Sequence, residues 1–144
     1  MQHKHHIVFL TGAGISQESG ISTFRDANGL WNNHKLEEVA SPEGFEKNPQ
    51  LVLDFYNARR RQLDEVNPNE AHHLIAQLET KYNVTIITQN IDDLHERAGS
   101  TNVLHLHGEL RKCRSSKNPN LIYDCNQDIK LGDLASDGNQ LRPH

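Results

Sequence analysis

The chain has 144 residues, of which 35% are apolar, and a net charge of −4, which suits a single domain with a modest core. Its Lys and Arg residues are scattered, without the basic stripe that is typical of a nucleic-acid-binding face. No segment approaches the roughly 18 apolar residues of a membrane span, and the apolar run at 7–10 is too short for a signal peptide. We therefore expect a cytoplasmic protein without a nucleic-acid or membrane partner.

The first predicted element is a buried strand over residues 7–11, which leads directly into a glycine turn and a helix. Residues 22–41 mix Gly, Asn, Asp and isolated apolar residues, and we expect a long, partly ordered loop there. The apolar spacing then predicts a helix over about 50–66. Helical residues thus separate the first strand from the next.

A second helix is marked by its capping pattern. Asn67 is the expected cap, Pro68 the first helical residue, and Glu70 the third position of a capping box. The predicted buried stripe of this helix is Ala71, Leu74, Ile75 and Leu78.

Two further strands are predicted over residues 84–88 and 102–107, with a short helix at about 92–98 between them. Residues 111–140 are polar, with few apolar islands. This order of strands and helices predicts an α/β fold built on a parallel sheet.

Three strand ends carry glycine or polar residues, at positions 12–14, 89–92 and 107–108. Ligands bind at the carboxyl ends of the strands in parallel sheets, so we expect a site at this edge. The first strand end satisfies part of a dinucleotide fingerprint, in which glycines let the backbone approach a pyrophosphate. The third glycine of that fingerprint is missing, so these residues alone leave a phosphate site and a plain turn equally open.

The segments GAGISQESGISTFR, TQNIDDLHERAG and LHLHG together closely resemble the sirtuin family of NAD-dependent protein deacylases. FYNARRRQL and the closing LRPH resemble the bacterial, class III type of this family. The resemblance implies a Rossmann-like domain that binds NAD, with a smaller inserted module that commonly carries zinc. It also implies removal of succinyl, malonyl and acetyl groups from protein lysines, yielding nicotinamide and O-acyl-ADP-ribose.

By this resemblance, NAD contacts the glycine turn, the loop that follows it, and the ends of the later strands. The implied residues are Gly12, Ala13, Gly14, Ile15, Ser16, Thr23, Phe24, Arg25, Trp31, Gln89, Asn90, Ile91, Asp92 and His107. Phe24 would shield the reactive ribose carbon, and Arg25 would pair with a phosphate or hold the loop. The alternative to these roles is that Phe24 only packs and Arg25 only lies at the surface. For Trp31, contact with NAD and a purely structural role as an anchor of the loop are equally open.

The same resemblance assigns catalysis to Asn90 and His107. Asn90 would orient ribose hydroxyls or a water, and Asp92 would accept from the nicotinamide amide; the alternative is that both only cap the next helix. His107 would take a proton from a ribose hydroxyl, which suits an imidazole near neutral pH. His105 lies on the same strand face, and only the resemblance chooses His107 over it.

Tyr56 and Arg59 stand three residues apart on a predicted helix, so both side chains can face one pocket. A guanidinium fork and a phenol hydroxyl suit a carboxylate. In class III sirtuins the matching pair recognises the acidic end of succinyl- or malonyl-lysine. The alternative is a solvated arginine face, and we assign Arg60 and Arg61 to the surface.

Only two cysteines are present, Cys113 and Cys125, and their spacing is that of neither a metal knuckle nor a redox pair. The family's metal module uses four cysteines, so we expect free thiols here, no bound metal and no zinc. The module would then depend on the packing of Leu121, Ile122 and Tyr123.

The predicted organisation is a Rossmann-like NAD-binding domain at 1–110, with a helical insertion at about 32–66, and a degenerate zinc-binding module at 111–140. The family continues beyond the closing LRPH, so we expect a truncated chain with the rest of the nucleotide fold after residue 144. The competing functions are a non-catalytic module that binds NAD or ADP-ribose and a protein mono-ADP-ribosyltransferase.

Overall fold

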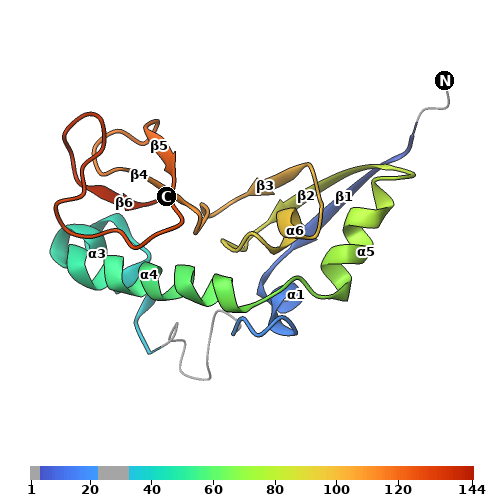
Figure 1. Cartoon of the computed structure of the whole chain (residues 1–144), viewed down its shortest axis with the longest axis horizontal. Helices are drawn as coiled ribbons and strands as arrows, with labels where there is room; N and C mark the ends of the chain where they lie inside the picture. The colour runs from blue at the N-terminus through green and yellow to red at the C-terminus, as the bar shows by residue number, and fades with distance from the viewer. Residues whose placement is uncertain (1–3, 23–32) are drawn as a thin grey trace. The chain divides into compact units, whose positions relative to one another are not determined.

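The computed structural model describes residues 4–22 and 33–144 of the chain. It divides into two compact units, residues 1–23 with 65–108 and residues 24–64 with 109–144. Each unit has a sheet of its own (Figure 1). The predicted helical insertion falls mainly in the second unit. Within the described residues, no helix combines the length and apolar character needed to cross a membrane.

The sheet of the first unit consists of β1 (His6–Thr11), β2 (Asn83–Thr88) and β3 (Val103–His105) in the order β1-β2-β3. All neighbours are parallel, and Phe9, Ile86 and Val103 are register partners across the three strands. The parallel sheet and the interleaved helices confirm the predicted α/β class.

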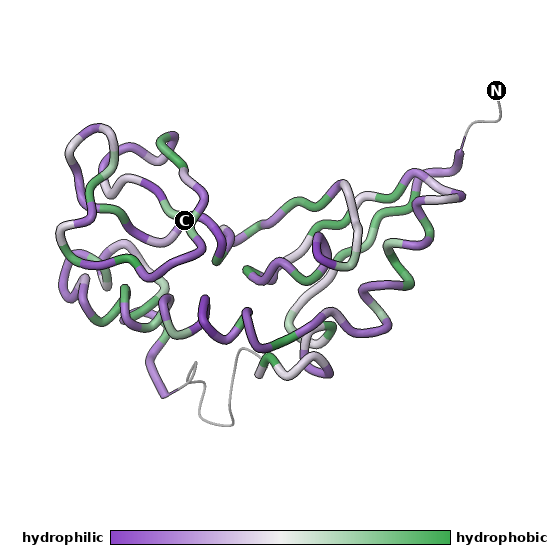
Figure 2. The backbone as a smooth tube through the Cα atoms, in the orientation of Figure 1, coloured by the Kyte–Doolittle hydropathy of each residue, from purple (hydrophilic) through white to green (hydrophobic). Residues whose placement is uncertain are grey.

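Helices α1 (Ala13–Gln17), α5 (Glu70–Leu78) and α6 (Leu94–Arg97) complete the first unit. Successive strand side chains point to opposite faces of the sheet. One face packs with residues of α1 and α5 into a cluster around Ile75, Val84 and Ile86. About half or more of the residue is exposed at Val8 and Leu10 of β1, at Leu104 of β3 and at Leu106 just after β3. The hydropathy colouring is accordingly hydrophobic along much of this sheet (Figure 2).

The start and the buried face of α5 differ from the prediction. Asn69, not Asn67, is the cap: its Oδ1 accepts from the Ala71 N–H at 3.0 Å. His72 and Ile75 are buried, whereas Ala71 and Leu74 are exposed. The Asn69 amide also donates to the Ile15 carbonyl at 2.7 Å. This contact between distant segments selects Asn69 as the cap and so moves the start of the helix.

The second unit begins with α2 (Leu36–Val39), α3 (Pro42–Lys47) and α4 (Pro49–Glu65). The long α4 confirms the predicted helix, but α2 lies inside the segment predicted as loop. The start of α3 has a clear local cause: the Ser41 hydroxyl accepts from the Gly44 N–H at 2.9 Å, and Pro42 occupies the first turn.

Three short strands form the antiparallel sheet of the second unit: β4 (Lys112–Ser115), β5 (Ile122–Asp124) and β6 (Leu141–Pro143), in the order β5-β4-β6. The core of this unit contains Phe45, Val52, Leu53, Cys113 and Ile129. Tyr123 packs against that core, as predicted, but Ile122 is 43% exposed. Side chains of α3 and α4 therefore supply packing that the sequence prediction assigned to the 121–123 segment.

Arg60 is buried, so its assignment to the surface is wrong. Only 1% of this residue is exposed. Its Nε donates to the Leu110 carbonyl at 2.8 Å, and its Nη1 donates to Asn57 Oδ1 at 2.7 Å. These two acceptors offset the cost of removing a guanidinium from water. Arg61, in contrast, is exposed and pairs with Asp128, as expected for a surface residue.

Candidate active site

The three strand ends singled out by the sequence lie along one edge of the parallel sheet. Gly12 follows β1 directly, Gln89 follows β2, and His107 stands two residues after β3. The backbone ladder continues past the strands, because the Gln89 N–H donates to the Thr11 carbonyl at 2.9 Å. The fold thus brings segments separated by more than 70 residues to the same edge.

The glycine turn between β1 and α1 leaves open space beside the backbone. Gly12 has an extended φ of −141°, which any residue adopts. Among the residues that the structure describes, a Cβ built on Gly14 would meet no atom within 4 Å. Packing within this described part of the chain therefore does not require glycine at position 14. Space of this kind fits a ligand that approaches the backbone closely, such as a pyrophosphate.

A buried hydrogen-bond network joins the glycine turn to the end of β2. Asn90 Nδ2 donates to the Gly12 carbonyl at 3.0 Å and lies 3.2 Å from Ser16 Oγ. The Ser16 hydroxyl donates in turn to Asp92 Oδ2 at 2.9 Å. All three side chains belong to residues that are less than 10% exposed. The network holds an amide and a carboxylate in fixed positions beside the turn.

The Asp92 carboxylate accepts hydrogen bonds at both of its oxygens, which agrees with a structural role at the start of α6, while its contact with nicotinamide stays a prediction. Its Oδ1 accepts from the Leu94 N–H at 3.1 Å, at the start of α6, while Oδ2 faces Ser16. Burial raises the pKa of this carboxyl group, and the hydrogen bonds from Leu94 and Ser16 oppose that rise. Any further donor that approached Asp92 would favour the ionised form in the same way.

Two buried histidines, His72 and His95, lie next to Thr11 at the end of β1 or against each other, and the sequence analysis missed both. His95 Nε2 lies 3.0 Å from Thr11 Oγ1, and the rings of His72 and His95 meet at a centroid distance of 4.9 Å. Burial lowers the pKa of both rings, that of His72 to about 4. Both are therefore neutral near pH 7. The only local sequence feature that could have indicated a structural role is the position of His72 three residues after the cap Asn69, where a side chain can accept from the N–H of the cap.

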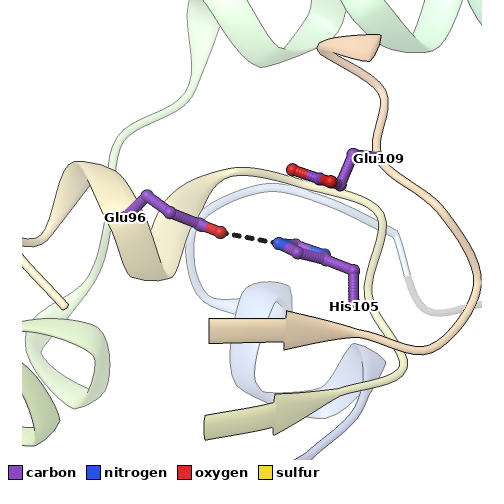
Figure 3. Close-up of side chains that lie close together, drawn as sticks. All are labelled: Glu96, His105 and Glu109. Carbon is purple, nitrogen blue, oxygen red and sulfur yellow. Dashed lines mark hydrogen bonds and ion pairs between the residues drawn. The ribbon is translucent and has the colours of Figure 1, made fainter. Parts of the chain in front are cut away.

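The two histidines of LHLHG occupy different environments. The ring of His105 is buried, with Nδ1 2.8 Å from the Asn90 carbonyl and Nε2 2.6 Å from a carboxylate oxygen of Glu96 (Figure 3). His107 is exposed at the sheet edge. It is followed by Gly108 with φ 84°, in the left-handed region that favours glycine.

The other residues implied for NAD binding divide into two groups. Ile15 packs against the core of the first unit, Gln89 is exposed, and Ala13 and Ile91 are half-buried. Thr23, Phe24, Arg25 and Trp31 lie outside the described residues.

Tyr56 and Arg59 lie on α4 in the second unit, and both contact the Phe55 ring. The Arg59 guanidinium sits 5.0 Å from the ring centroid, and the Tyr56 ring meets Phe55 edge-on at 5.4 Å. Burial raises the pKa of Tyr56 to about 12, so its hydroxyl keeps its proton near neutral pH. Burial lowers the pKa of Arg59, but arginine starts high enough to stay charged. The pair offers a neutral donor and a cation from one helix.

A parallel sheet with an open glycine turn and a buried amide–carboxylate network at its carboxyl edge defines an α/β protein of the nucleotide-binding class. The profile described as "Sir2 family" matches residues 12–136. The chain belongs to the Sir2 family.

Individual relatives agree with this assignment. An NAD-dependent protein deacylase from Helicobacter pylori is 66% identical over 138 residues, which are 96% of this chain and 60% of the relative. A solved Sir2 homologue in complex with NAD has a TM-score of 0.82 at 44% identity, over 97% of this chain and 56% of that one. A Sir2 protein bound to an acetylated peptide has a TM-score of 0.74 at 33% identity, over 96% and 57%. The chain thus spans about 60% of the length of the curated relatives it matches.

Proposed function

We propose that this chain acts as an NAD-dependent protein-lysine deacylase. The observation that carries the proposal is the buried network in which Asn90 links Gly12 to Ser16 and Asp92 beside an open glycine turn. Family membership and the names of the relatives support the same activity. The solved structures with NAD and with an acetylated peptide come from Sir2 proteins and support the two classes of ligand.

NAD, when bound, supplies the ADP-ribose that accepts the acyl group and the nicotinamide that leaves. The backbone at Gly12 and Gly14 would lie against the pyrophosphate, because the open space there admits close approach. The Asn90 amide would orient a ribose hydroxyl or a water. The Asp92 carboxylate would accept from the amide of nicotinamide, with Ser16 holding it in place.

His107 is the proposed general base. Its imidazole would take a proton from a ribose hydroxyl on a ring nitrogen, which prepares that oxygen to accept the acyl group. Its exposure at the sheet edge supports this role, since a base must reach its substrate. His105 is the poorer candidate because both of its ring nitrogens already contact oxygens of the chain.

Incubation of the chain with NAD and an acetyl-lysine peptide tests the activity. We expect nicotinamide release, with free lysine and O-acyl-ADP-ribose as the other products. The variant His107→Tyr should lose release while it retains NAD binding in calorimetry. Binding of NAD by the wild-type chain without release would indicate a non-catalytic module, and label transfer to a protein acceptor would indicate ADP-ribosylation.

We also propose that the enzyme prefers acidic acyl groups. The charged Arg59 and the protonated Tyr56 hydroxyl would together bind the terminal carboxylate of succinyl- or malonyl-lysine. Arg59→Met should reduce succinyl turnover far more than acetyl turnover. Arg61→Met, two positions along α4 and exposed, is the matched control and should leave both unchanged. Equal losses on both substrates in the Arg59 variant would refute the preference.

We infer that the second unit folds without zinc, because its thiols do not fit a metal site. Structural zinc sites take four ligands, commonly thiolates. Burial, with a smaller contribution from the neighbouring Cys125, raises the pKa of Cys113 to about 12. The Cys125 thiol donates to the Gln127 carbonyl at 3.3 Å. The two thiols supply only half of a four-ligand set, and among the described residues neither cysteine belongs to a group of three or more possible metal ligands.

A polar contact supports the same antiparallel sheet instead. The buried Ser115 hydroxyl donates to Asp137 Oδ2 at 2.7 Å and accepts from the N–H groups of Lys117 and Asn118, both at 3.1 Å. Elemental analysis should find no zinc in the purified chain, and a chelator should leave its melting temperature unchanged. Ser115→Ala should lower the melting temperature. One tightly held zinc per chain would refute the inference.

A further inference from the structure

The ring of His105 is enclosed between two oxygen atoms of the first unit. Its Nδ1 lies 2.8 Å from the backbone oxygen of Asn90, and its Nε2 lies 2.6 Å from Oε1 of Glu96. Only 6% of the His105 side chain is exposed. Figure 3 shows the ring projecting from β3 toward the Glu96 carboxylate on α6. A backbone carbonyl oxygen has no proton to give, so Nδ1 must donate the first of these hydrogen bonds.

The second contact also requires a proton on the ring. Burial alone would raise the pKa of Glu96, but the hydrogen bond from His105 and a backbone hydrogen bond oppose that rise, and the net shift lowers the pKa. Glu96 is therefore an ionised carboxylate near neutral pH, and a carboxylate only accepts. An imidazole that donates from both nitrogens carries two protons and a positive charge. Among the described residues, the other titratable groups near this ring are the neutral His95 and the carboxyls of Asp92 and Glu109, the last of which Figure 3 shows beside the ring.

His105 holds the backbone of Asn90 from one side, and β2 holds it from the other. The Asn90 N–H donates to Thr88 Oγ1 at 3.1 Å, while its carbonyl accepts from His105. These two main-chain hydrogen bonds fix the position of the backbone from which the Asn90 side-chain amide reaches Gly12 and Ser16. Glu96 completes the arrangement by tying the same ring to α6.

We propose that His105 is a doubly protonated positioning residue, which clamps the Asn90 backbone to Glu96 of α6 and so aims the Asn90 amide into the active site. This inference rests on the proposed function, in which that amide contacts NAD. It gives the first histidine of LHLHG a task different from that of His107: His105 acts through Asn90 and does not touch the substrate.

Nitrogen NMR of the wild-type chain near neutral pH tests the protonation state directly and needs no activity. We expect both ring nitrogens of His105 to carry protons, whereas the buried His72, whose pKa is lowered to about 4, should be neutral under the same conditions. A His105 spectrum with one bare ring nitrogen would overturn the proposal.

Variants test the positioning role. A glutamine side chain donates from one nitrogen only, whereas the doubly protonated imidazole donates from two. His105→Gln therefore cannot bond Asn90 and Glu96 at once, and the Asn90 side-chain amide resonances should shift. Glu96→Gln keeps an oxygen that accepts from Nε2 and should shift them less. His73→Gln, on the exposed side of α5, is the matched control and should shift nothing. Unmoved Asn90 resonances in a folded His105→Gln variant would overturn the clamp.

Kinetics separate positioning from mere support of the fold. Misplacement of a group that orients a reactant lowers turnover, so kcat of His105→Gln should fall by about tenfold or more. KM for the acyl-lysine peptide should stay within about twofold, because the peptide does not contact Asn90 in this scheme. An unchanged kcat would overturn the proposal. If the wild type releases no nicotinamide, the proposed function fails, and the NMR results still decide the protonation and the clamp.

Discussion

Acid should destabilise the first unit, because its structure buries the ring of His72 in the neutral form. The ring is completely buried, and its Nδ1 accepts the N–H of Asn69, the cap residue of α5, at 3.2 Å. A proton added at Nδ1 would remove that acceptor. Within the part of the chain that the structure describes, Nε2 has no hydrogen-bond partner that would stabilise a charged ring. Protonation of His72 therefore destabilises the folded state in two ways: it removes the hydrogen bond from Asn69, and it places an unpaired charge in the interior.

The magnitude follows from the pKa of the ring. Burial, with smaller contributions from His95 and His73, lowers it from 6.5 to about 4. Between these two values the unfolded chain binds a proton that the folded chain does not, so the free energy of unfolding falls as the pH falls. At about 1.4 kcal/mol per pH unit, the loss from this ring amounts to roughly 3 kcal/mol. Burial lowers the pKa of His95 as well, which adds a loss in the same direction.

Hydrogen exchange of the β2 amides, followed from pH 7 down to about pH 4, measures the opening free energy of this unit. We expect a steep decline for the wild type. His72→Gln should be less stable near pH 7 but decline less steeply, since the titrating ring is gone. Gln77→Ala, on the same helix, exposed and without a titrating group, should follow the wild-type slope. An equally steep decline in His72→Gln would refute the reasoning.

Two further predictions compare positions with opposite packing. Ile86→Ala should lower the free energy of unfolding by about 2–5 kcal/mol, because Ile86 is fully buried. Leu104→Ala should change that free energy by no more than about 0.5 kcal/mol, because Leu104 is 53% exposed. Urea denaturation measures both changes. Gly44→Ala should destabilise the second unit by about 1–3 kcal/mol, since its Cβ would lie 2.4 Å from the Glu38 carbonyl oxygen, and hydrogen exchange of β4 checks it. Gly14→Ala should leave stability within about 0.5 kcal/mol but weaken NAD binding in calorimetry, because its Cβ would enter the open space; unchanged affinity would contradict the proposed pyrophosphate site.

Local sequence signals predicted the parallel sheet and most of its edge. The strands at β1 and β2 are β-branched or apolar runs that end in glycine or polar residues, and this pattern depends only on neighbouring positions. Helix α4 follows from its apolar spacing for the same reason. The Ser41–Pro42 pair is a local signal for the start of α3, but the sequence analysis did not predict this helix.

Hydrogen bonds between distant residues decided what the local signals did not. The sequence analysis placed the cap of α5 at Asn67, whereas in the structure Asn69 is the cap and its side chain contacts the Ile15 carbonyl, 54 positions away. Arg60 looks like a surface arginine until the Leu110 carbonyl, 50 positions away, provides its acceptor.

The sequence by itself determined the sheet type, the glycine turn and the polar strand ends, because strand and turn preferences arise from neighbouring residues. Only the tertiary structure decided how the two histidines of LHLHG differ: the His105 ring is buried against the Asn90 carbonyl and Glu96, while His107 is exposed. The physical reason is that a buried polar group takes its state from the partners that surround it, and those partners meet only in the folded chain.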